Sequence, residues 1–386
     1  MPIFVLAIYY TDMRIIHFLF SAAVVPALFS IMMLSSCGKG AQSEPDVWLG
    51  ADISWATQLE NEGAVFHTKD GTPMECTALM KNLGLDAVRL RVWVDPSSKG
   101  GYCDAEDLLV KAKRADDLGM AVMVDFHYSD FWADPKKQNI PASWSGKPYE
   151  EIKSLLSEHT KDVLTLLKDN GITPRWVQVG NETSNGFLWT VKGDWWGDPI
   201  REEDGSITIL ESVGHLRNNP SQYAGLFSAG YDAVKSVFPE AEVIVHLDNG
   251  FDQDLYDRNL DTLRKYGAKW DIVGLSMYPY WALDSGLEKD EDESITHCFS
   301  NIHHIVQKYG TPCMIVETGF EVNESDPSVM EKGRDQLARI VRLSRESAGE
   351  CRGVFYWEPE CKPSQYKLGA FTADGYPTVI MDGFKQ

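Results

Sequence analysis

Two glutamates, Glu182 and Glu317, each follow a short apolar run of the kind that forms a buried strand. Glu182 comes directly after Asn181, and Glu317 comes after Met314–Val316. Two carboxyl groups that flank one cavity can hydrolyse a glycosidic bond, because one protonates the leaving oxygen while the other traps the oxocarbenium-like centre. Either glutamate alone could equally be a salt-bridge partner, so their chemistry depends on a fold that brings them together.

Eight short apolar runs alternate with amphipathic segments, and the two glutamates end the fourth and the seventh run. The runs are Trp48–Ser54, Ala87–Val94, Ala121–His127, Trp176–Glu182, Val243–Asp248, Ile272–Tyr278, Met314–Thr318 and Gly353–Glu358. The amphipathic segments include Asp104–Leu118, Tyr149–Asp169, Ser221–Phe238 and Met330–Ser347. Apolar strands separated by helices indicate a parallel sheet covered by helices. The pattern predicts an α/β fold, a (β/α)8 TIM barrel that forms a single catalytic domain over residues 47–386.

Polar and aromatic residues follow nearly every predicted strand. Examples are Asp52-Ile53-Ser54-Trp55, Asp125-Phe126-His127-Tyr128 and Tyr356-Trp357-Glu358. In β/α barrels the strands all end at one face, and that face carries the active site. A barrel with only a structural role would not gather Trp, His, Arg and carboxylates at one rim, so these endings favour an enzyme.

Several motifs extend this pattern and resemble one family. Asn181-Glu182 together with Glu317 resembles the clan of retaining β/α-barrel glycosidases. Within that clan the chain resembles the family-53 endo-β-1,4-galactanases, also called arabinogalactan endo-β-1,4-galactanases, from about residue 48 to 377. The motifs that carry the resemblance are Gly50–Ser54, Arg89–Pro96, Asp125–Pro135, Val179–Glu182, Gly274–Trp281, Val316–Gly319 and Val354–Pro359.

The resemblance implies that the protein cleaves β-1,4-galactosidic bonds inside galactan or type I arabinogalactan. It implies that Glu182 is the acid/base, that Glu317 is the nucleophile, and that the anomeric configuration is retained. Retention requires the two carboxyl groups to lie about 5–5.5 Å apart, whereas inversion requires about 6.5–9.5 Å. Two alternatives stay open: another endo-β-glycanase of the clan, such as a mannanase or a cellulase, and a surface lipoprotein that binds glycans without cleaving them.

Further residues of the same motifs are expected to support this chemistry. Asn181 can hydrogen-bond the sugar 2-hydroxyl. Arg89 is expected to orient Glu317 and keep it ionised, and Arg91 could serve instead. Tyr278 is placed to hydrogen-bond Glu317. The full set of predicted substrate-binding residues is Asp52, Arg89, His127, Asp130, Trp132, Asn181, His246, Tyr278 and Trp357.

The longest insertion, about Thr183 to Asn219, carries Phe187, Trp189, Trp195 and Trp196. Exposed loops rich in tryptophan are unusual unless they bind something. We expect this insertion to lengthen a sugar-binding cleft, with a loop folded over its own small core as the alternative.

No cofactor or metal is expected. Some bacterial members of the family have a calcium loop after the seventh strand, but the corresponding Phe320–Pro327 segment lacks an alternating series of oxygen ligands. The six cysteines after residue 37 allow fifteen disulfide pairings, between which the sequence does not choose. They are Cys76, Cys103, Cys298, Cys313, Cys351 and Cys361.

Residues 1–37 have the pattern of an export signal. Arg14 precedes an apolar run that ends in Leu34-Ser35-Ser36-Cys37. This resembles a bacterial lipoprotein signal in which Cys37 is lipidated, and a start at Met13 would give it an ordinary length. Residues 38–46 are predicted to be a flexible tether. We therefore expect a protein that is exported and anchored by lipid to a bacterial membrane, at the cell surface or the periplasmic face.

The formal net charge of −21 excludes polyanionic partners such as nucleic acid. A neutral polysaccharide is not affected by such a field. The expected partners are therefore the galactan substrate and, through the lipid anchor alone, a membrane. The protein itself is expected to be a monomer.

Overall fold

Eight parallel strands close into a barrel in the computed structural model, which describes residues 44–385. The strands follow one another around the barrel in the order β1-β10-β9-β8-β7-β4-β3-β2. Their bounds are β1 (Trp48–Asp52), β2 (Ala87–Val92), β3 (Ala121–Phe126), β4 (Trp176–Val179), β7 (Glu242–Leu247), β8 (Ile272–Ser276), β9 (Cys313–Glu317) and β10 (Cys351–Trp357). All eight predicted strands are therefore confirmed, most of them one to three residues shorter than predicted.

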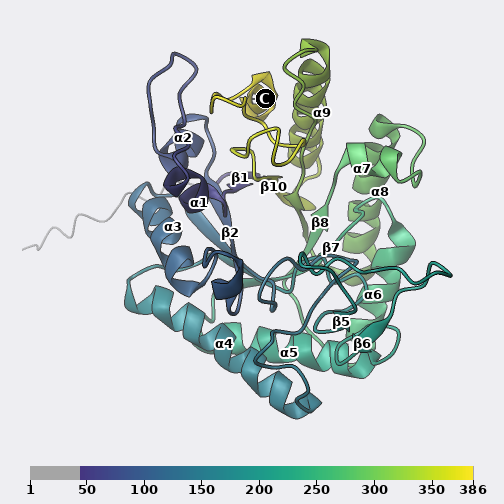
Figure 1. Cartoon of the computed structure of the whole chain (residues 1–386). Coiled ribbons are helices and arrows are strands. Elements are labelled where there is room, and N and C mark those ends of the chain that lie inside the picture. The colour runs from purple at the N-terminus through teal and green to yellow at the C-terminus, as the bar shows by residue number, and fades with distance from the viewer. Residues whose placement is uncertain (1–43, 386) are drawn as a thin grey trace, which may run out of the picture. The chain divides into compact units, whose positions relative to one another are not determined.

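Helices surround the strands (Figure 1). Their bounds are α1 (Ala56–Asn61), α2 (Cys76–Asn82), α3 (Ala105–Asp117), α4 (Tyr149–Asp169), α5 (Pro220–Val237), α6 (Gln253–Lys265), α7 (Pro279–Asp284), α8 (Glu291–Tyr309) and α9 (Pro327–Glu346), with 3-10 turns at Pro96–Lys99 and Val379–Lys385. Side chains cap several helix starts: Asp104 accepts from the N–H of Asp107 at α3. None of the described helices is long and apolar enough to cross a membrane.

The interior of the barrel is apolar at one end and polar at the other. Its apolar layer consists of Ala87, Met123, Trp176, Ile244, Ile272, Met314, Val316 and Phe355. Inward side chains recur every second residue along a strand, so Met123 is followed on the inner face by Asp125. Likewise Trp176 is followed by Gln178. A polar layer therefore lies directly above the apolar one, at the carboxyl end of the strands.

The close packing of the apolar layer explains Gly50 in β1. A Cβ atom at this position would lie 2.3 Å from the ring of Phe355, so no other residue fits without moving that ring. Strand register then aligns the polar layer. In the parallel sheet, Asp52 lies opposite Arg89 of β2 on one side and opposite Trp357 of β10 on the other.

The predicted export signal at 1–37 and most of the predicted tether, 38–46, lie outside the described residues. The segment Pro45–Gln386 forms one compact unit. A small antiparallel pair, β5 (Thr190–Val191) and β6 (Ile209–Glu211), belongs to the predicted insertion and is separate from the barrel sheet.

Candidate active site

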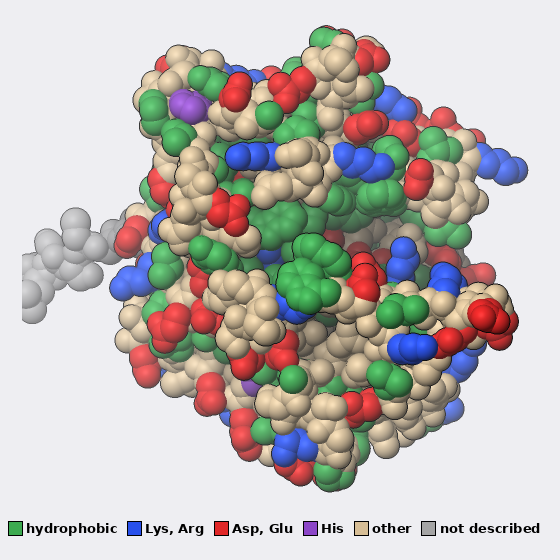
Figure 2. All heavy atoms as spheres, viewed as in Figure 1, with side chains coloured by type: hydrophobic (Ala, Val, Ile, Leu, Met, Phe, Trp, Pro, Cys, Tyr) green, Lys and Arg blue, Asp and Glu red, His purple; other side chains and the backbone are tan. Residues whose placement is uncertain are grey.

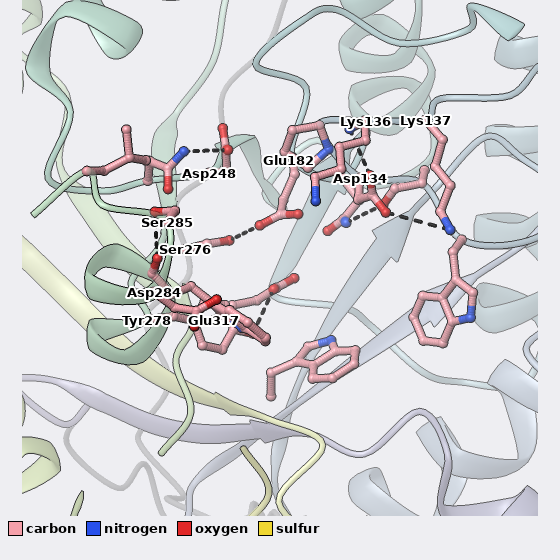
Figure 3. A pocket seen from close by; sticks show the side chains of 18 of the residues that line it. Asp134, Lys136, Lys137, Glu182, Asp248, Ser276, Tyr278, Asp284, Ser285 and Glu317 are labelled. Carbon is pink, nitrogen blue, oxygen red and sulfur yellow. Dashed lines mark hydrogen bonds and ion pairs between the residues drawn. The ribbon is translucent and has the colours of Figure 1, made fainter. Parts of the chain in front are cut away.

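A cavity of about 760 Å³ lies at the carboxyl end of the barrel strands, and both Glu182 and Glu317 line it. Figure 2 shows this face hollowed, with acidic, basic and hydrophobic side chains around the hollow. In Figure 3 the two glutamates extend into the same space from different strands. The expectation that β4 and β9 bring them together is confirmed, and the separation of their carboxyl groups stays a prediction.

Glu317, the last residue of β9, is held by two donors. Its Oε1 pairs with Nη2 of Arg89 at 2.9 Å, and its Oε2 accepts a hydrogen bond of 3.0 Å from the hydroxyl of Tyr278. Only 5% of Glu317 is exposed. Both carboxylate oxygens are therefore fixed, and the contacts predicted for Arg89 and Tyr278 are present.

Arg89 serves three carboxylates at once. Besides Glu317 it pairs with Asp52 at 2.7 Å and with Asp125 at 2.9 Å. The guanidinium is completely buried. Three buried carboxylates around one cation leave an excess of negative charge, so the cation is divided among them rather than devoted to Glu317.

This division corrects one expectation. Burial raises the pKa of Glu317 to about 7, and the nearby charges of Asp125 and Asp52 also raise it. The positive charge of Arg89 and the hydrogen bond from Tyr278 lower it, but not enough to offset the burial. Arg89 therefore orients Glu317 as predicted, but the pKa of the carboxyl stays above its ordinary value because desolvation outweighs the attraction.

Glu182 lies three residues beyond the end of β4, in a strained backbone. Its φ is 46°, in the left-handed region that residues other than glycine seldom adopt. The backbone is held there by hydrogen bonds: the N–H of Glu182 donates to Nδ1 of His246 (3.2 Å) and that of Thr183 to the carbonyl of His246 (2.9 Å). Such strain persists where the surrounding structure fixes it, and it is common at active sites.

The side chain of Glu182 ends a directed chain of hydrogen bonds. Because Nδ1 of His246 accepts from the backbone of Glu182, we place the ring proton on Nε2, which lies 2.8 Å from Oγ of Ser276. The Ser276 hydroxyl then donates to Oε1 of Glu182 at 2.6 Å. The chain orients one oxygen of Glu182 and leaves Oε2 to carry a proton towards the cavity.

Glu182 has no cation among its polar contacts in the described structure. Burial raises its pKa well above the ordinary value, and the nearby charges of Glu317 and Asp248 raise it further. The two glutamates thus differ in the right sense for acid and nucleophile: Glu317 has cationic and hydroxyl donors, while Glu182 keeps its proton to higher pH.

Asn181, directly before Glu182 in the sequence, lines the same cavity as the two glutamates. Its Oδ1 accepts from Nη2 of Arg89 at 2.8 Å, and its Nδ2 donates to the carbonyl of Ala133 at 2.8 Å. An amide nitrogen has two protons, so one remains for a ligand. This fits the hydrogen bond to a sugar hydroxyl that the sequence predicted.

Aromatic rings form one wall of the cavity. Trp132 and Trp357 both line it, with ring centroids 5.9 Å apart, and Trp55 packs against both. The guanidinium carbon of Arg91 lies 4.1 Å from the centroid of Trp132. The predicted position of Trp357 in the wall of the cleft is confirmed.

Arg91 does not substitute for Arg89. It pairs with Glu358 at 2.6 Å and its guanidinium packs against the Trp132 ring of the aromatic wall. The suggestion that Arg91 could orient Glu317 is therefore wrong. The reason is register. The two arginines share a strand face, but Arg91 lies two residues further along β2 and therefore faces Glu358 at the end of β10.

Three other predicted contacts with sugar are placed differently by the structure, whereas a fourth, His127, is not. Asp52 and His246 are completely buried beneath the cavity, where they hold Arg89 and Ser276. Asp130 accepts from the N–H groups of Asp95 and Ala142 and so fixes a loop. His127 does line the cavity.

Both ring nitrogens of His127 have protein partners. Nδ1 accepts from the N–H of Ala133 at 3.2 Å, and Nε2 lies 3.0 Å from Asp125. The ring therefore offers a ligand its carbon edge rather than a hydrogen bond.

Residues that the sequence did not single out complete the site. Gln178 lies within a buried strand, bridges Asp125 and His246, and accepts from Arg89. Ser276 ends β8, and Asp248 lines the cavity beside Glu182. A polar residue inside an otherwise apolar strand was the available signal for Gln178; for Ser276 and Asp248 only their positions at strand ends could have indicated a role.

Part of the tryptophan-rich insertion folds over a small core of its own, as the alternative expectation had it, while the lengthening of a sugar-binding cleft stays a prediction. Phe187 and Trp189 are buried, at 0% and 4% exposure, so part of the insertion has a core of its own. Trp195 and Trp196 are 60% and 53% exposed. Neither of them lines the catalytic cavity.

All six cysteines between residues 44 and 385 are free and buried. Over the same range, no group of three or more His, Cys, Asp or Glu side chains is arranged to hold a metal ion.

Comparisons with known proteins give a consistent result. Residues 48–379 match the family described as glycosyl hydrolase family 53. An arabinogalactan endo-β-1,4-galactanase A of Emericella nidulans is 31% identical over 80% of this chain and 84% of its own length. An endo-β-1,4-galactanase of Bacillus subtilis (strain 168) is 28% identical over 81% of this chain and 70% of its own. A structure from work on two fungal β-1,4-galactanases is 23% identical, covers 89% of this chain and 100% of its own, and superposes with a TM-score of 0.74.

Proposed function

The chain belongs to glycosyl hydrolase family 53, and from this premise we propose that it hydrolyses β-1,4-galactosidic bonds inside galactan, including the backbone of type I arabinogalactan. The relatives of Emericella nidulans and Bacillus subtilis support this choice of substrate, since both are named as endo-β-1,4-galactanases. The observation that carries the proposal is the pair Glu182 and Glu317, which line one cavity at the barrel mouth in unlike electrostatic surroundings.

The proposed reaction has two steps and retains the anomeric configuration. In the first, an ionised oxygen of Glu317 attacks the anomeric carbon while Glu182 gives its proton to the leaving glycosidic oxygen, so that a galactosyl ester forms as the bond breaks. In the second, Glu182 takes a proton from water, the water oxygen attacks the same carbon, and the ester bond to Glu317 breaks. Glu182 ends protonated again and Glu317 ionised, ready for another cycle.

The surrounding residues fit this sequence of events. Arg89 and Tyr278 hold the nucleophile in one orientation, and reacting groups held in place gain most from proximity. Ser276 fixes the acid. Asn181 offers its spare amide proton to the sugar 2-hydroxyl. Trp132 and Trp357 give apolar faces against which sugar rings can stack.

Purified protein is expected to shorten potato-type galactan quickly to oligosaccharides while leaving mannan and cellulose intact. Product chromatography measures this directly, and the Glu317→Gln variant provides the inactive control. Cleavage of mannan or cellulose in place of galactan would favour another β-glycanase of the clan. Binding of galactan without any cleavage would favour a glycan-binding lipoprotein.

We also propose that the protein is exported and anchored by a lipid at Cys37. The support is the sequence alone: an apolar run that ends in Leu34-Ser35-Ser36-Cys37. Cys37→Ala should move the protein out of the membrane fraction or leave an uncleaved precursor. A mature-sized variant that still fractionates with membranes would contradict the anchor.

A further inference from the structure

Three aromatic rings, one half-buried and two exposed, form a surface next to the catalytic cavity. Phe131 follows β3, and Trp195 and Trp196 belong to the insertion after β4. Their ring centroids are close to one another: 6.1 Å for Phe131 and Trp195, 5.9 Å for Phe131 and Trp196, and 4.7 Å between the two tryptophans. We call these three residues the outer aromatic shelf.

The shelf continues the wall of the cavity. Phe131 packs against Trp132, with ring centroids 5.9 Å apart, and Trp132 lines the cavity. A second link runs through Lys137, which also lines the cavity and whose Nζ donates to the carbonyl of Trp196 at 3.2 Å. An extended chain that leaves the cavity over Trp132 would therefore pass directly onto the shelf.

The shelf is held in place before any ligand binds. Oδ1 of Asp194 accepts from the N–H of Trp196 (2.8 Å) and of Asp198 (3.0 Å), which closes a tight turn under the rings. Lys137 pairs with Asp198 at 2.5 Å. The ammonium of Lys99 lies 3.8 Å from the ring centroid of Trp195. Binding to surfaces that are already ordered loses little conformational entropy.

Exposing the apolar rings of Trp195 and Trp196 to water is unfavourable. Trp195 and Trp196 leave 60% and 53% of their surface in solvent, whereas Phe187 and Trp189 of the same insertion are buried in its core. Folding alone would favour burying all four, and contiguous exposed aromatic surface on a soluble domain typically marks a binding site. Figure 2 shows hydrophobic side chains gathered beside the hollow of this face.

We propose that the outer aromatic shelf is an accessory sugar-binding site that stacks galactosyl units of the polymer outside the catalytic cavity. The inference rests on the proposed function, because the occupant is the galactan chain whose scissile bond lies between Glu182 and Glu317. The ligand is a neutral β-linked hexose polymer, whose apolar C–H faces suit the rings. The site makes the enzyme prefer long chains to short oligosaccharides.

The test compares substrates of increasing length. In a Trp195→Ala/Trp196→Ala double variant, the KM for long galactan should rise about tenfold, which corresponds to the loss of about 1.4 kcal/mol of binding. The kcat/KM for β-1,4-galactotriose, too short to span both sites, should stay as in wild type. The matched control is Leu210→Ala, which removes another exposed apolar side chain of the same insertion, also 60% exposed. It should change neither value.

Three outcomes would overturn the inference. An unchanged KM for long galactan shows that the rings bind no sugar. An equal loss on galactotriose and on polymer shows that the change disturbs the catalytic cavity. A shift from dimer to monomer in light scattering, with the length preference intact, assigns the surface to a second copy of the chain. Failure of wild-type protein to cleave any galactan would instead reject the proposed function, and this inference with it.

Discussion

The two sides of the catalytic cavity hold the same kind of side chain in opposite surroundings. On the β9 side, Glu317 is bonded by the Arg89 guanidinium and the Tyr278 hydroxyl. On the β4 side, Glu182 is bonded by the neutral hydroxyl of Ser276 and faces the carboxylate of Asp248 along the same wall. The difference teaches that role follows from partners rather than from residue type: one carboxyl can ionise first, and the other keeps its proton.

The largest expected effect comes from removing either carboxyl. Glu317→Gln should lower kcat on galactan by about four to six orders of magnitude, as loss of a nucleophile does. Glu182→Gln should cost about 10²–10⁴-fold, as loss of a general acid does. Stopped assays on galactan measure both values.

A substrate with a good leaving group separates the two roles. A dinitrophenyl β-galactoside needs no proton from Glu182, so its cleavage by Glu182→Gln should show a burst followed by slow turnover. Glu317→Gln should stay inactive on it. Glu321→Gln, four residues beyond the nucleophile and outside the cavity lining, is the matched control and should behave as wild type. Equal sensitivity of both catalytic variants to the leaving group would show that the roles are not divided as proposed.

The β9 side can be weakened without removing its carboxyl. Tyr278→Phe deletes a hydrogen bond to a charged group, worth about 1.5–3 kcal/mol, so kcat should fall about 10–100-fold. That hydrogen bond also lowers the pKa of Glu317, which lies at about 7. Glu317 must be ionised, so activity is lost as pH falls through its pKa. The variant should therefore lose activity at a higher pH, and its acid limb should move upward.

The pH profile of kcat/KM is the measurement for this variant, because it reports the free enzyme. A fall in kcat with both limbs in place would contradict the assignment, since it would show that Tyr278 does not act through the ionisation of Glu317.

The β4 side should respond at the opposite limb and more weakly. Ser276→Ala deletes a hydrogen bond that lowers the pKa of Glu182, so that pKa rises. Glu182 must be protonated, and activity is lost as pH rises through its pKa. The alkaline limb should therefore move to higher pH, with a loss of about two- to tenfold in kcat, as for one neutral hydrogen bond.

Asp248→Asn provides the control of opposite sign. It removes a charge that raises the pKa of Glu182, so the alkaline limb should move to lower pH. If Ser276→Ala and Asp248→Asn moved this limb in the same direction, or moved the acid limb, the electrostatic account of Glu182 would fail.

Much of this comparison could be predicted from sequence, and the reasons are physical. Eight apolar runs with period-two inward positions indicate a barrel, and a barrel brings every strand end to one face. The positions of Glu182, Glu317, Asn181 and Trp357 follow from that. The contact between Arg89 and Glu317 was expected from the motifs that carry the family resemblance.

The parts that were missed depend on register and on competition between partners. Arg89 and Arg91 are two residues apart on β2, and this difference in position gives them different partners: Arg89 contacts the nucleophile Glu317, and Arg91 contacts Glu358. The pKa of Glu317 depends on Asp52 and Asp125 sharing the same cation, which no linear pattern reveals. The strained φ of Glu182 arises from hydrogen bonds to His246, a residue 64 positions further along the chain.

Trapping the covalent intermediate tests the central claim most directly. A 2-deoxy-2-fluoro-β-galactobioside with a dinitrophenyl leaving group should inactivate the enzyme. The fluorine slows both the formation and the hydrolysis of the galactosyl ester, and the dinitrophenyl leaving group keeps its formation fast enough for the ester to accumulate. Peptide mass spectrometry is expected to find one fluorogalactobiosyl group on Glu317. A label on Glu182, on Glu358 or on any other carboxylate would contradict the account, as would complete turnover of galactan with inverted anomeric configuration.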